Sequence, residues 1–220
     1  MNHLVYQANS ILAGQTFEYA VCGGYAIDLF LGYESRKHGD IDIMAFWSDR
    51  DKIIKYMQNL DYEVYEMLGG GKGFHITDIR TQYKVKNNIF CCKKDCELVR
   101  FYESDEKDIY VIDFERVWQS KLNFVEFIFN EKRDGDFLYS RNNAIKRNLK
   151  ETILYNKNIP YLAPEICLLY KSTDTAREGY QQDYELAVKR MSEEQKNWFE
   201  QALMVMNPNG HKWSNIEKYN

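Results

Sequence analysis

Asp40 and Asp42 are the residues best suited to chemistry, because they lie two apart in the run Asp40-Ile41-Asp42-Ile43. Alternating polar and apolar residues predict a half-buried β-strand, on which residues two apart point to the same face. We therefore expect the two carboxylates to lie together while Ile41 and Ile43 enter the core. Two carboxylates on one face repel each other unless a cation lies between them, and Mg²⁺ prefers carboxylate oxygen as a ligand. The pair predicts a magnesium site.

A glycine pair, Gly23-Gly24, lies a short distance before these carboxylates. It separates an apolar run at 19–22, which predicts a buried strand, from an amphipathic segment at 25–31, which predicts a helix ended by Gly32. Because glycine lacks Cβ, the backbone amides that open this helix can approach a phosphate closely. Phosphate-binding amides, a basic turn and a metal-binding Asp-x-Asp together indicate nucleotidyl transfer.

The same residues carry a family resemblance. Gly-Gly-x-Ala-x-Asp from Gly23, followed by Arg-x-His-x-Asp-Ile-Asp from Arg36, resembles the nucleotidyltransferase superfamily, and within it the bacterial aminoglycoside and lincosamide adenylyltransferases. The run 159–171, Ile-Pro-Tyr-Leu-Ala-Pro-Glu-x-x-Leu-Leu-Tyr-Lys, is similar to one branch of these transferases. That branch carries Lys-Asp-Glu-x-Asp-Phe further on, where this chain has Gly-Tyr-Gln-Gln-Asp-Tyr at 179–184. Only Asp183 and an aromatic residue match there.

This resemblance implies an α+β fold, with a nucleotidyltransferase-type mixed sheet, flanking helices and a small C-terminal helical subdomain. The residue pattern changes near Asn158: two of the three prolines occur just after it, and helical patterns follow them. We therefore expect a catalytic domain at 1–155 and a helical subdomain at 156–220.

The resemblance also implies the roles of three carboxylates. Asp40 and Asp42 would be the ligands shared by two Mg²⁺ ions, which can stabilise the entering and leaving oxygens together. Glu126 is the expected third carboxylate, as a further metal ligand or the acceptor of the hydroxyl proton, because it matches the family position and is the one charged residue in the apolar run 124–129. Asp113 and Asp78 are the alternatives.

Basic residues and the glycine pair would bind the nucleotide. Gly23 and Gly24 are expected to hold the β- and γ-phosphates through backbone amides, while Arg36 and His38 steady a phosphate from the turn before Asp40. Lys171 would reach the triphosphate. Two plainer interpretations stay open: His38 could cap its turn, and the Lys171 side chain could extend along apolar surface into solvent.

The function expected from these residues and the resemblance is metal-dependent transfer of AMP from ATP to a hydroxyl of a small acceptor. The resemblance implies an aminoglycoside-like antibiotic as the class of acceptor. One alternative is a protein-modifying nucleotidyltransferase of the toxin–antitoxin type. Another is a nucleotide-binding module that has lost catalysis, which the intact carboxylates disfavour.

Composition narrows the class of partner and the compartment. With 29 Lys and Arg against 33 Asp and Glu, the formal charge of −4 argues against a general nucleic-acid binder. No apolar run approaches the roughly 20 residues of a membrane span, and the first residues lack a signal-peptide pattern, so we expect a cytoplasmic protein. Five cysteines, an odd number, suit a reducing compartment. Cys91-Cys92 with Cys96 is the one cluster, and it lacks zinc-type spacing.

Three local patterns predict secondary structure without chemistry. Gly69-Gly70-Gly71-Lys72-Gly73 lacks the Gly-Lys-Ser/Thr ending of a phosphate loop and predicts a flexible loop. Ser48 to Asp51 resembles a helix capping box, and so do Ser192 and Gln195.

Overall fold

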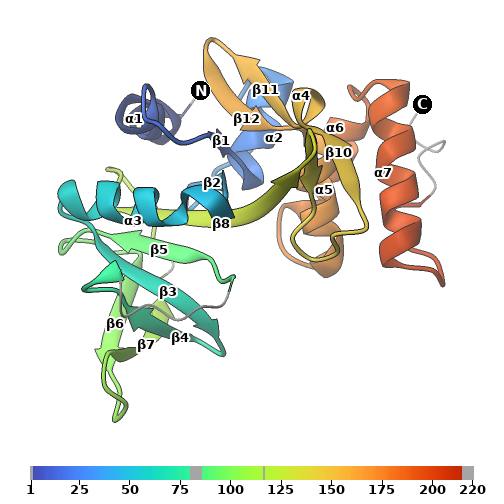
Figure 1. Cartoon of the computed structure of the whole chain (residues 1–220). Coiled ribbons are helices and arrows are strands. Elements are labelled where there is room, and N and C mark those ends of the chain that lie inside the picture. Colours follow the sequence, from blue (N-terminus) through green and yellow to red (C-terminus); the bar gives the residue numbers. More distant parts are fainter. Residues whose placement is uncertain (1, 80–85, 116, 215–220) are drawn as a thin grey trace. The chain divides into compact units, whose positions relative to one another are not determined.

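The computed structural model describes residues 2–79, 86–115 and 117–214 (Figure 1). The chain is an α+β protein, as predicted, and its Cα atoms cluster into two compact units. Residues 2–19 and 38–131 form what we call the sheet unit. Residues 20–37 and those from 132 onward form what we call the helical unit.

The sheet unit contains a mixed, mostly antiparallel sheet. Its strands follow the order β2 (Asp42–Phe46), β8 (Phe124–Arg133), β5 (Ile89–Cys92), β3 (Glu63–Gly69), β4 (Lys72–His75), β7 (Ile109–Phe114) and β6 (Val99–Glu103). Among these neighbouring pairs, β2–β8 is parallel and the others are antiparallel. The strand predicted at residues 40–43 begins at Asp42, so Asp40 lies in the bend before it.

Two helices of the sheet unit bury apolar residues at helical spacing. α1 (His3–Leu12) buries Leu4, Val5, Ala8 and Leu12. After a 3₁₀ turn at Trp47–Asp49, α3 (Arg50–Asn59) buries its apolar face and packs on β3 (Figure 1). The capping box predicted here is wrong: within the described residues no side chain caps α3, and Asp49 instead pairs with Lys52, Oδ1 to Nζ, at 2.8 Å.

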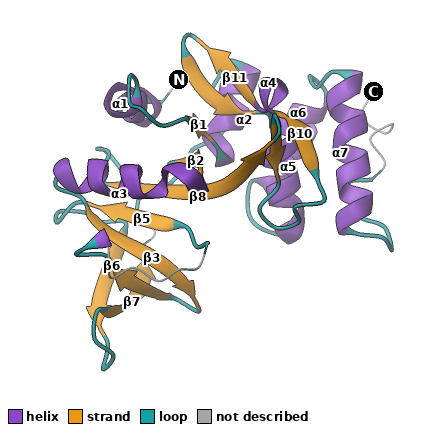
Figure 2. Cartoon of the chain, in the orientation of Figure 1, coloured by secondary structure: helices purple, strands orange, loops and turns teal. Residues whose placement is uncertain are grey.

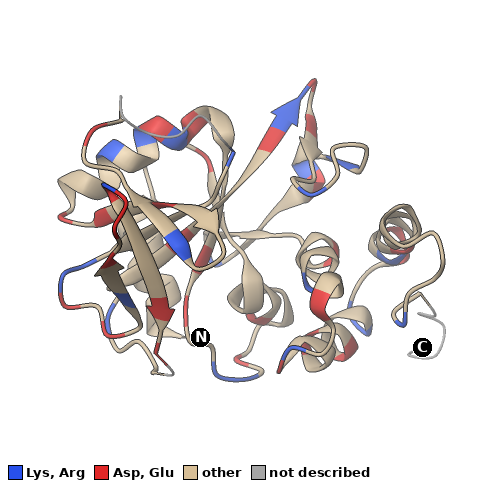
Figure 3. Cartoon of the chain, turned by 90° about the horizontal axis from the view of Figure 1, so that it is seen from below, with Lys and Arg blue, Asp and Glu red and all other residues tan. Residues whose placement is uncertain are grey.

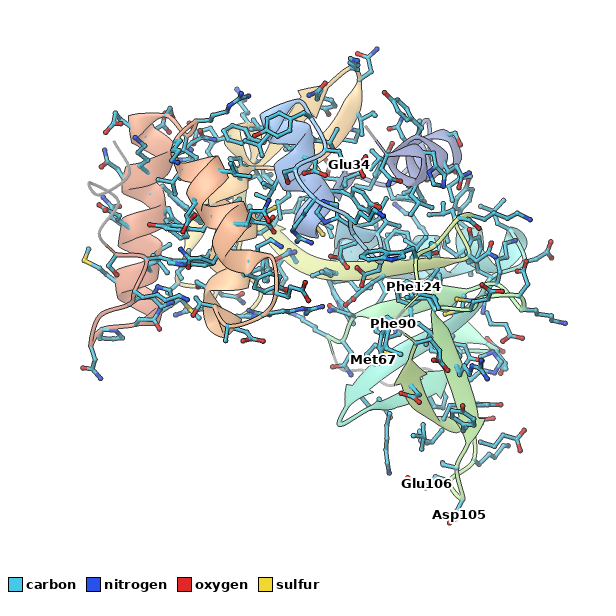
Figure 4. All side chains as sticks on the ribbon, turned by 180° about the vertical axis from the view of Figure 1, so that it is seen from behind. Glu34, Met67, Phe90, Asp105, Glu106 and Phe124 are labelled. Atoms are coloured by element: carbon cyan, nitrogen blue, oxygen red, sulfur yellow. The ribbon has the colours of Figure 1, made fainter. Side chains whose placement is uncertain are left out.

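One face of the sheet folds over an apolar cluster that contains two phenylalanines, Phe90 and Phe124 (Figure 4). The ring of Phe114 on β7 lies 5.6 Å from that of Phe90 and 6.1 Å from that of Phe124, centroid to centroid. The sheet is therefore strongly curved, as the right-handed twist of strands allows. The buried members of the cluster are Tyr65, Phe90, Cys92, Leu98, Val99, Ile112 and Phe124.

The helical unit combines short strands with most of the chain's helices (Figure 2). In β1 (Tyr19–Val21), Val21 pairs in parallel with Tyr161 of β12, and β11 pairs with β12 in antiparallel fashion. The remaining elements are β9 (Asp136–Leu138), β10 (Lys146–Asn148), β11 (Ile153–Asn156), β12 (Ile159–Leu162), α2 (Gly23–Leu31), α4 (Leu149–Thr152), α5 (Pro164–Lys171), a 3₁₀ turn (Ser172–Asp174), α6 (Tyr180–Val188) and α7 (Glu193–Met206).

Local signals place the ends of these helices. Gly32 ends α2 in the left-handed conformation with φ of 82°, and Pro164 opens α5. The predicted capping box of α7 is present, with Ser192 and Gln195 bonding reciprocally. None of the helices in the described ranges is long and apolar enough to cross a membrane. Figure 3 shows acidic and basic segments interspersed along the ribbon.

A buried ion pair joins β10, α5 and α7 within the helical unit. Glu165, fully buried, lies 3.1 Å from Arg147 and accepts a hydrogen bond of 2.9 Å from the side-chain amide of Gln195. Burial raises the pKa of Glu165 to about 7, although Arg147 and Gln195 oppose that shift. The folded state therefore binds a proton at Glu165 more tightly than the unfolded chain does.

This pKa predicts how stability depends on pH. Because the folded pKa lies above the unfolded value of 4.5, stability should fall as pH rises from about 4.5 to about 7, by up to about 3 kcal/mol from this group. Glu165→Gln should remove that part of the slope, measured by urea unfolding between pH 5 and 8. Glu194→Gln, which changes an exposed partner of Arg147, should keep the wild-type slope. An unchanged slope in Glu165→Gln would contradict this account.

Candidate functional site

Asp42 and Glu126 are register partners in the parallel strands β2 and β8. Neighbouring strands lie about 4.8 Å apart, and register partners present their side chains on the same face. The next pair, Ile43 and Phe127, is fully buried, so it lies on the other face. The two half-buried carboxylates are therefore neighbours, although 84 positions separate them in the sequence.

Asp42 and Glu126 begin a row of register partners that continues across the sheet into aromatic residues. Glu126 pairs with Phe90 on β5, and Phe90 pairs with Tyr65 on β3. Because paired residues share a face, the carboxylates stand at one end of a row whose other members enter the apolar cluster. The two carboxylates are thus packed beside aromatic side chains that the apolar cluster holds in place.

Asn88 holds the Glu126 carboxylate. Its Nδ2 donates a hydrogen bond of 3.0 Å to Oε1 of Glu126. This bond limits the orientation of the carboxylate and helps to offset its repulsion from Asp42. Asn88 was not among the predicted site residues, because an asparagine just before a short strand carries no local signal of this contact.

Asp40 lies half-buried in the bend two residues before Asp42. Across the described ranges, no three or more His, Cys, Asp or Glu side chains are gathered so that they could hold a metal ion. The donor set of Asp42 and Glu126, with Asp40 adjacent in sequence, consists of oxygen alone and suits Mg²⁺ chemically. The metal roles of the three residues stay predictions.

The alternative third carboxylates lie elsewhere in the sheet unit. Asp113 on β7 is exposed and pairs with Arg100 on β6. It alternates with Ile112 and Phe114, which contact the apolar cluster, so its side chain points away from the cluster. Asp78 lies outside any strand, after β4. Glu126 is the one of the three that is in register with Asp42.

The glycine pair opens α2 in the helical unit. Gly23 has φ of +66°, a conformation that favours glycine, and Gly24 follows it in the first turn. The first amides of a helix lack partners within the helix and attract anions. Asp28, later in α2, accepts hydrogen bonds from the amide and hydroxyl of Ser35, at 2.9 and 2.5 Å, and so orders the turn after the helix.

Two predicted phosphate ligands meet at Asp183 of α6. Arg36 donates to both carboxylate oxygens of Asp183, at 2.9 and 2.8 Å, and Nζ of Lys171 lies 2.9 Å from one of them. Lys171 is only 4% exposed and lies over the ring of Tyr180, so the alternative that it extends into solvent is wrong. His38, in the sheet unit, is also buried.

Asp183 keeps its charge despite complete burial. Burial acts to raise its pKa, but the hydrogen bonds and charges of Arg36 and Lys171 outweigh it, and the pKa lies below its usual value. The three side chains therefore form a network with one more positive than negative charge. In the sequence, Asp183 stands out only as a match to the family pattern, and no local pattern predicts its contacts with Arg36 and Lys171.

The first third of the chain is similar in sequence to a known protein family. Residues 4–68 match the family model of aminoglycoside-2''-adenylyltransferase, a range that contains the glycine pair, Arg36, Asp40 and Asp42. A sequence comparison with curated proteins gave no match.

Three solved structures share the fold. The lincosamide antibiotic adenylyltransferase LnuA, lincomycin-bound, is 13% identical, with a TM-score of 0.54 over 87% of this chain and 98% of its own. The antibiotic-resistance factor ANT(2'')-Ia in solution is 12% identical, with a TM-score of 0.52 over 94% of this chain and 92% of its own. ANT(2'')-Ia in complex with adenylyl-2''-tobramycin is 12% identical, with a TM-score of 0.51 over 93% and 97%. The chain therefore has the fold of the aminoglycoside and lincosamide adenylyltransferases, and part of its sequence matches the family model of aminoglycoside-2''-adenylyltransferase.

Proposed function

We propose that this protein is a nucleotidyltransferase that transfers AMP from ATP to a hydroxyl group of a small antibiotic-like acceptor. The observation that carries the proposal is the pair of carboxylates, Asp42 and Glu126, in register on two parallel strands. The family match over residues 4–68 and the likeness to enzymes that act on lincomycin and tobramycin support the acceptor class. Because ATP is the donor, we place the reaction in the cytoplasm.

The carboxylates would act on the attacking hydroxyl. Its oxygen forms a bond to the α-phosphorus of ATP, the bond from that phosphorus to the bridging oxygen breaks, and pyrophosphate leaves. Glu126, oriented by Asn88, would take the hydroxyl proton. Asp40 and Asp42, with Glu126, would hold Mg²⁺, which neutralises phosphate charge when bound.

The nucleotide phosphates would bind the glycine pair and the basic residues. The amides of Gly23 and Gly24 open α2, where an anion is favoured. Arg36 and Lys171 would act as an oriented pair of positive charges, because Asp183 fixes both and neutralises only one of them. We propose that His38 contributes a further contact to a phosphate.

The leading test is a pyrophosphate-release screen of the purified protein with ATP, Mg²⁺ and a panel of aminoglycosides and lincosamides. We expect turnover with at least one acceptor, and Asp42→Asn should lower kcat/KM at least about 100-fold, because it removes a charge that the reaction needs. Asp61→Asn is the matched control: it changes an exposed aspartate with φ of 60°, which asparagine tolerates, and should leave turnover unchanged.

Other outcomes separate the alternatives. Transfer of labelled nucleotide to proteins, without transfer to any antibiotic, would favour the protein-modifying alternative. Nucleotide binding without any transfer would favour a binding module. Wild-type turnover in Asp42→Asn would overturn the mechanism.

A second test concerns the third carboxylate. Glu126→Gln keeps the size of the side chain and an acceptor for Asn88 but removes the charge. It should lower kcat by about 100-fold or more while changing nucleotide affinity less than about threefold, because a proton acceptor acts mainly in the transition state. Asp113→Asn, which changes an exposed carboxylate on β7, should leave both values near wild type. The reverse pattern, measured by steady-state kinetics and calorimetry, would assign the role to Asp113.

A further inference from the structure

The turn that opens α6 packs against the side chain of Arg36. Gly179 caps the helix with φ of +81°, a backbone conformation that favours glycine. A Cβ built on Gly179 would lie 2.6 Å from Nε and 2.7 Å from Cζ of Arg36. Atoms at these distances overlap, so the guanidinium occupies the space that any other side chain at position 179 would need.

Asp183 fixes the orientation of this guanidinium. Nε and Nη2 of Arg36 donate to the two carboxylate oxygens of Asp183, at 2.9 and 2.8 Å, and this paired geometry sets both the place and the plane of the group. The Arg36 side chain keeps 22% of its surface exposed, so a phosphate can still contact it. A methyl group at position 179 would push the guanidinium aside, because the end of a long side chain moves more easily than backbone. Its paired geometry with Asp183 would then be lost.

The next residue of the turn, Tyr180, contacts the second cation. Nζ of Lys171 lies over the Tyr180 ring, 4.1 Å from its centre, and 2.9 Å from an oxygen of Asp183. The face of an aromatic ring attracts an ammonium group. Residues 179–183 therefore contact both basic side chains.

We propose that Gly179 and Tyr180 are positioning residues, which set the Arg36 guanidinium and the Lys171 ammonium where they bind the triphosphate of the nucleotide. Gly179 acts by leaving room for Arg36, and Tyr180 acts on Lys171 through its ring. Neither residue needs to contact the nucleotide itself. The inference rests on the proposed function, because it takes Arg36 and Lys171 as phosphate ligands.

The backbone conformation and the absent side chain are two separate demands on Gly179, and a second glycine separates them. Gly135, in the turn between β8 and β9, has a similar φ of +86°. Among the described residues, a Cβ on Gly135 would meet no heavy atom within 4 Å beyond its chain neighbours. Gly135→Ala therefore has the strain of a positive φ without a clash, and it is the matched control for Gly179→Ala.

The test measures binding of inorganic tripolyphosphate, with Mg²⁺, to the full chain by calorimetry. Gly179→Ala should weaken this binding at least about tenfold, because it displaces a charged hydrogen-bond donor. Arg36→Ala, in which Lys171 still pairs with Asp183, should weaken it by a similar factor. Adding Gly179→Ala to Arg36→Ala should cause no further loss, since no guanidinium remains to be displaced. Gly135→Ala should bind like wild type.

Two changes at Tyr180 test the other half of the proposal. Tyr180→Leu should weaken tripolyphosphate binding about threefold or more, because it removes the aromatic face beside Lys171. Tyr180→Phe keeps that face and should bind like wild type. Circular dichroism and urea unfolding check that each variant is folded, and the Tyr180 pair gives an independent result if Gly179→Ala does not fold.

The proposal is overturned if wild type binds no tripolyphosphate or if Gly179→Ala binds it like wild type. It is also overturned if the loss caused by Gly179→Ala persists in the Arg36→Ala background, which would indicate backbone strain alone. The proposed function fails in a different way. Wild-type protein that binds tripolyphosphate but transfers nucleotide to no acceptor would reject the reaction and leave this inference in place.

Discussion

The parallel pairing of β2 with β8 is the interaction on which the proposed site depends. Its register places Asp42 opposite Glu126 and buries Ile43 and Phe127 together on the other face. Because side chains alternate along a strand, a slip of one residue would move Glu126 to the buried face. The cost of exposing Phe127 and burying Glu126 without a partner is what specifies this register.

Placing two carboxylates side by side opposes folding. Like charges on neighbouring strands repel each other, and partial burial removes some of the water that would screen them. The surrounding structure offsets this cost through the aromatic row from Phe90 to Tyr65 and the hydrogen bond from Asn88. The two carboxylates are therefore supported by neighbouring side chains of the sheet, as the proposed site would require.

Asp183 has a comparable role in the helical unit. It draws together Arg36, after α2, and Lys171, at the end of α5, and it remains ionised because both cations contact it. Removing such a buried partner leaves charges without compensation, which is strongly destabilising. The orientation of the two basic side chains thus depends on a third residue that takes no part in the proposed chemistry.

Short sequence patterns predict most of the local elements and show which types of residue are available for chemistry. Alternation around Asp42 and Glu126, the glycine pair, the stop at Gly32 and the cap at Ser192 depend on contacts between residues close in the chain, so a short pattern suffices to predict them. One local prediction was wrong: the capping box expected at Ser48 to Asp51 is absent from the start of α3. Packing of α3 on the sheet stabilises this helix without a side-chain cap.

Which of these residues lie close together in space depends on how the strands and helices pack. Whether Glu126 or Asp113 lies in register with Asp42 depends on strand order. The contacts of Asn88 with Glu126 and of Asp183 with its two cations depend on the path of the backbone. Strand order and register result from burying apolar faces that are distant in sequence. A local sequence pattern therefore does not predict which strands become neighbours.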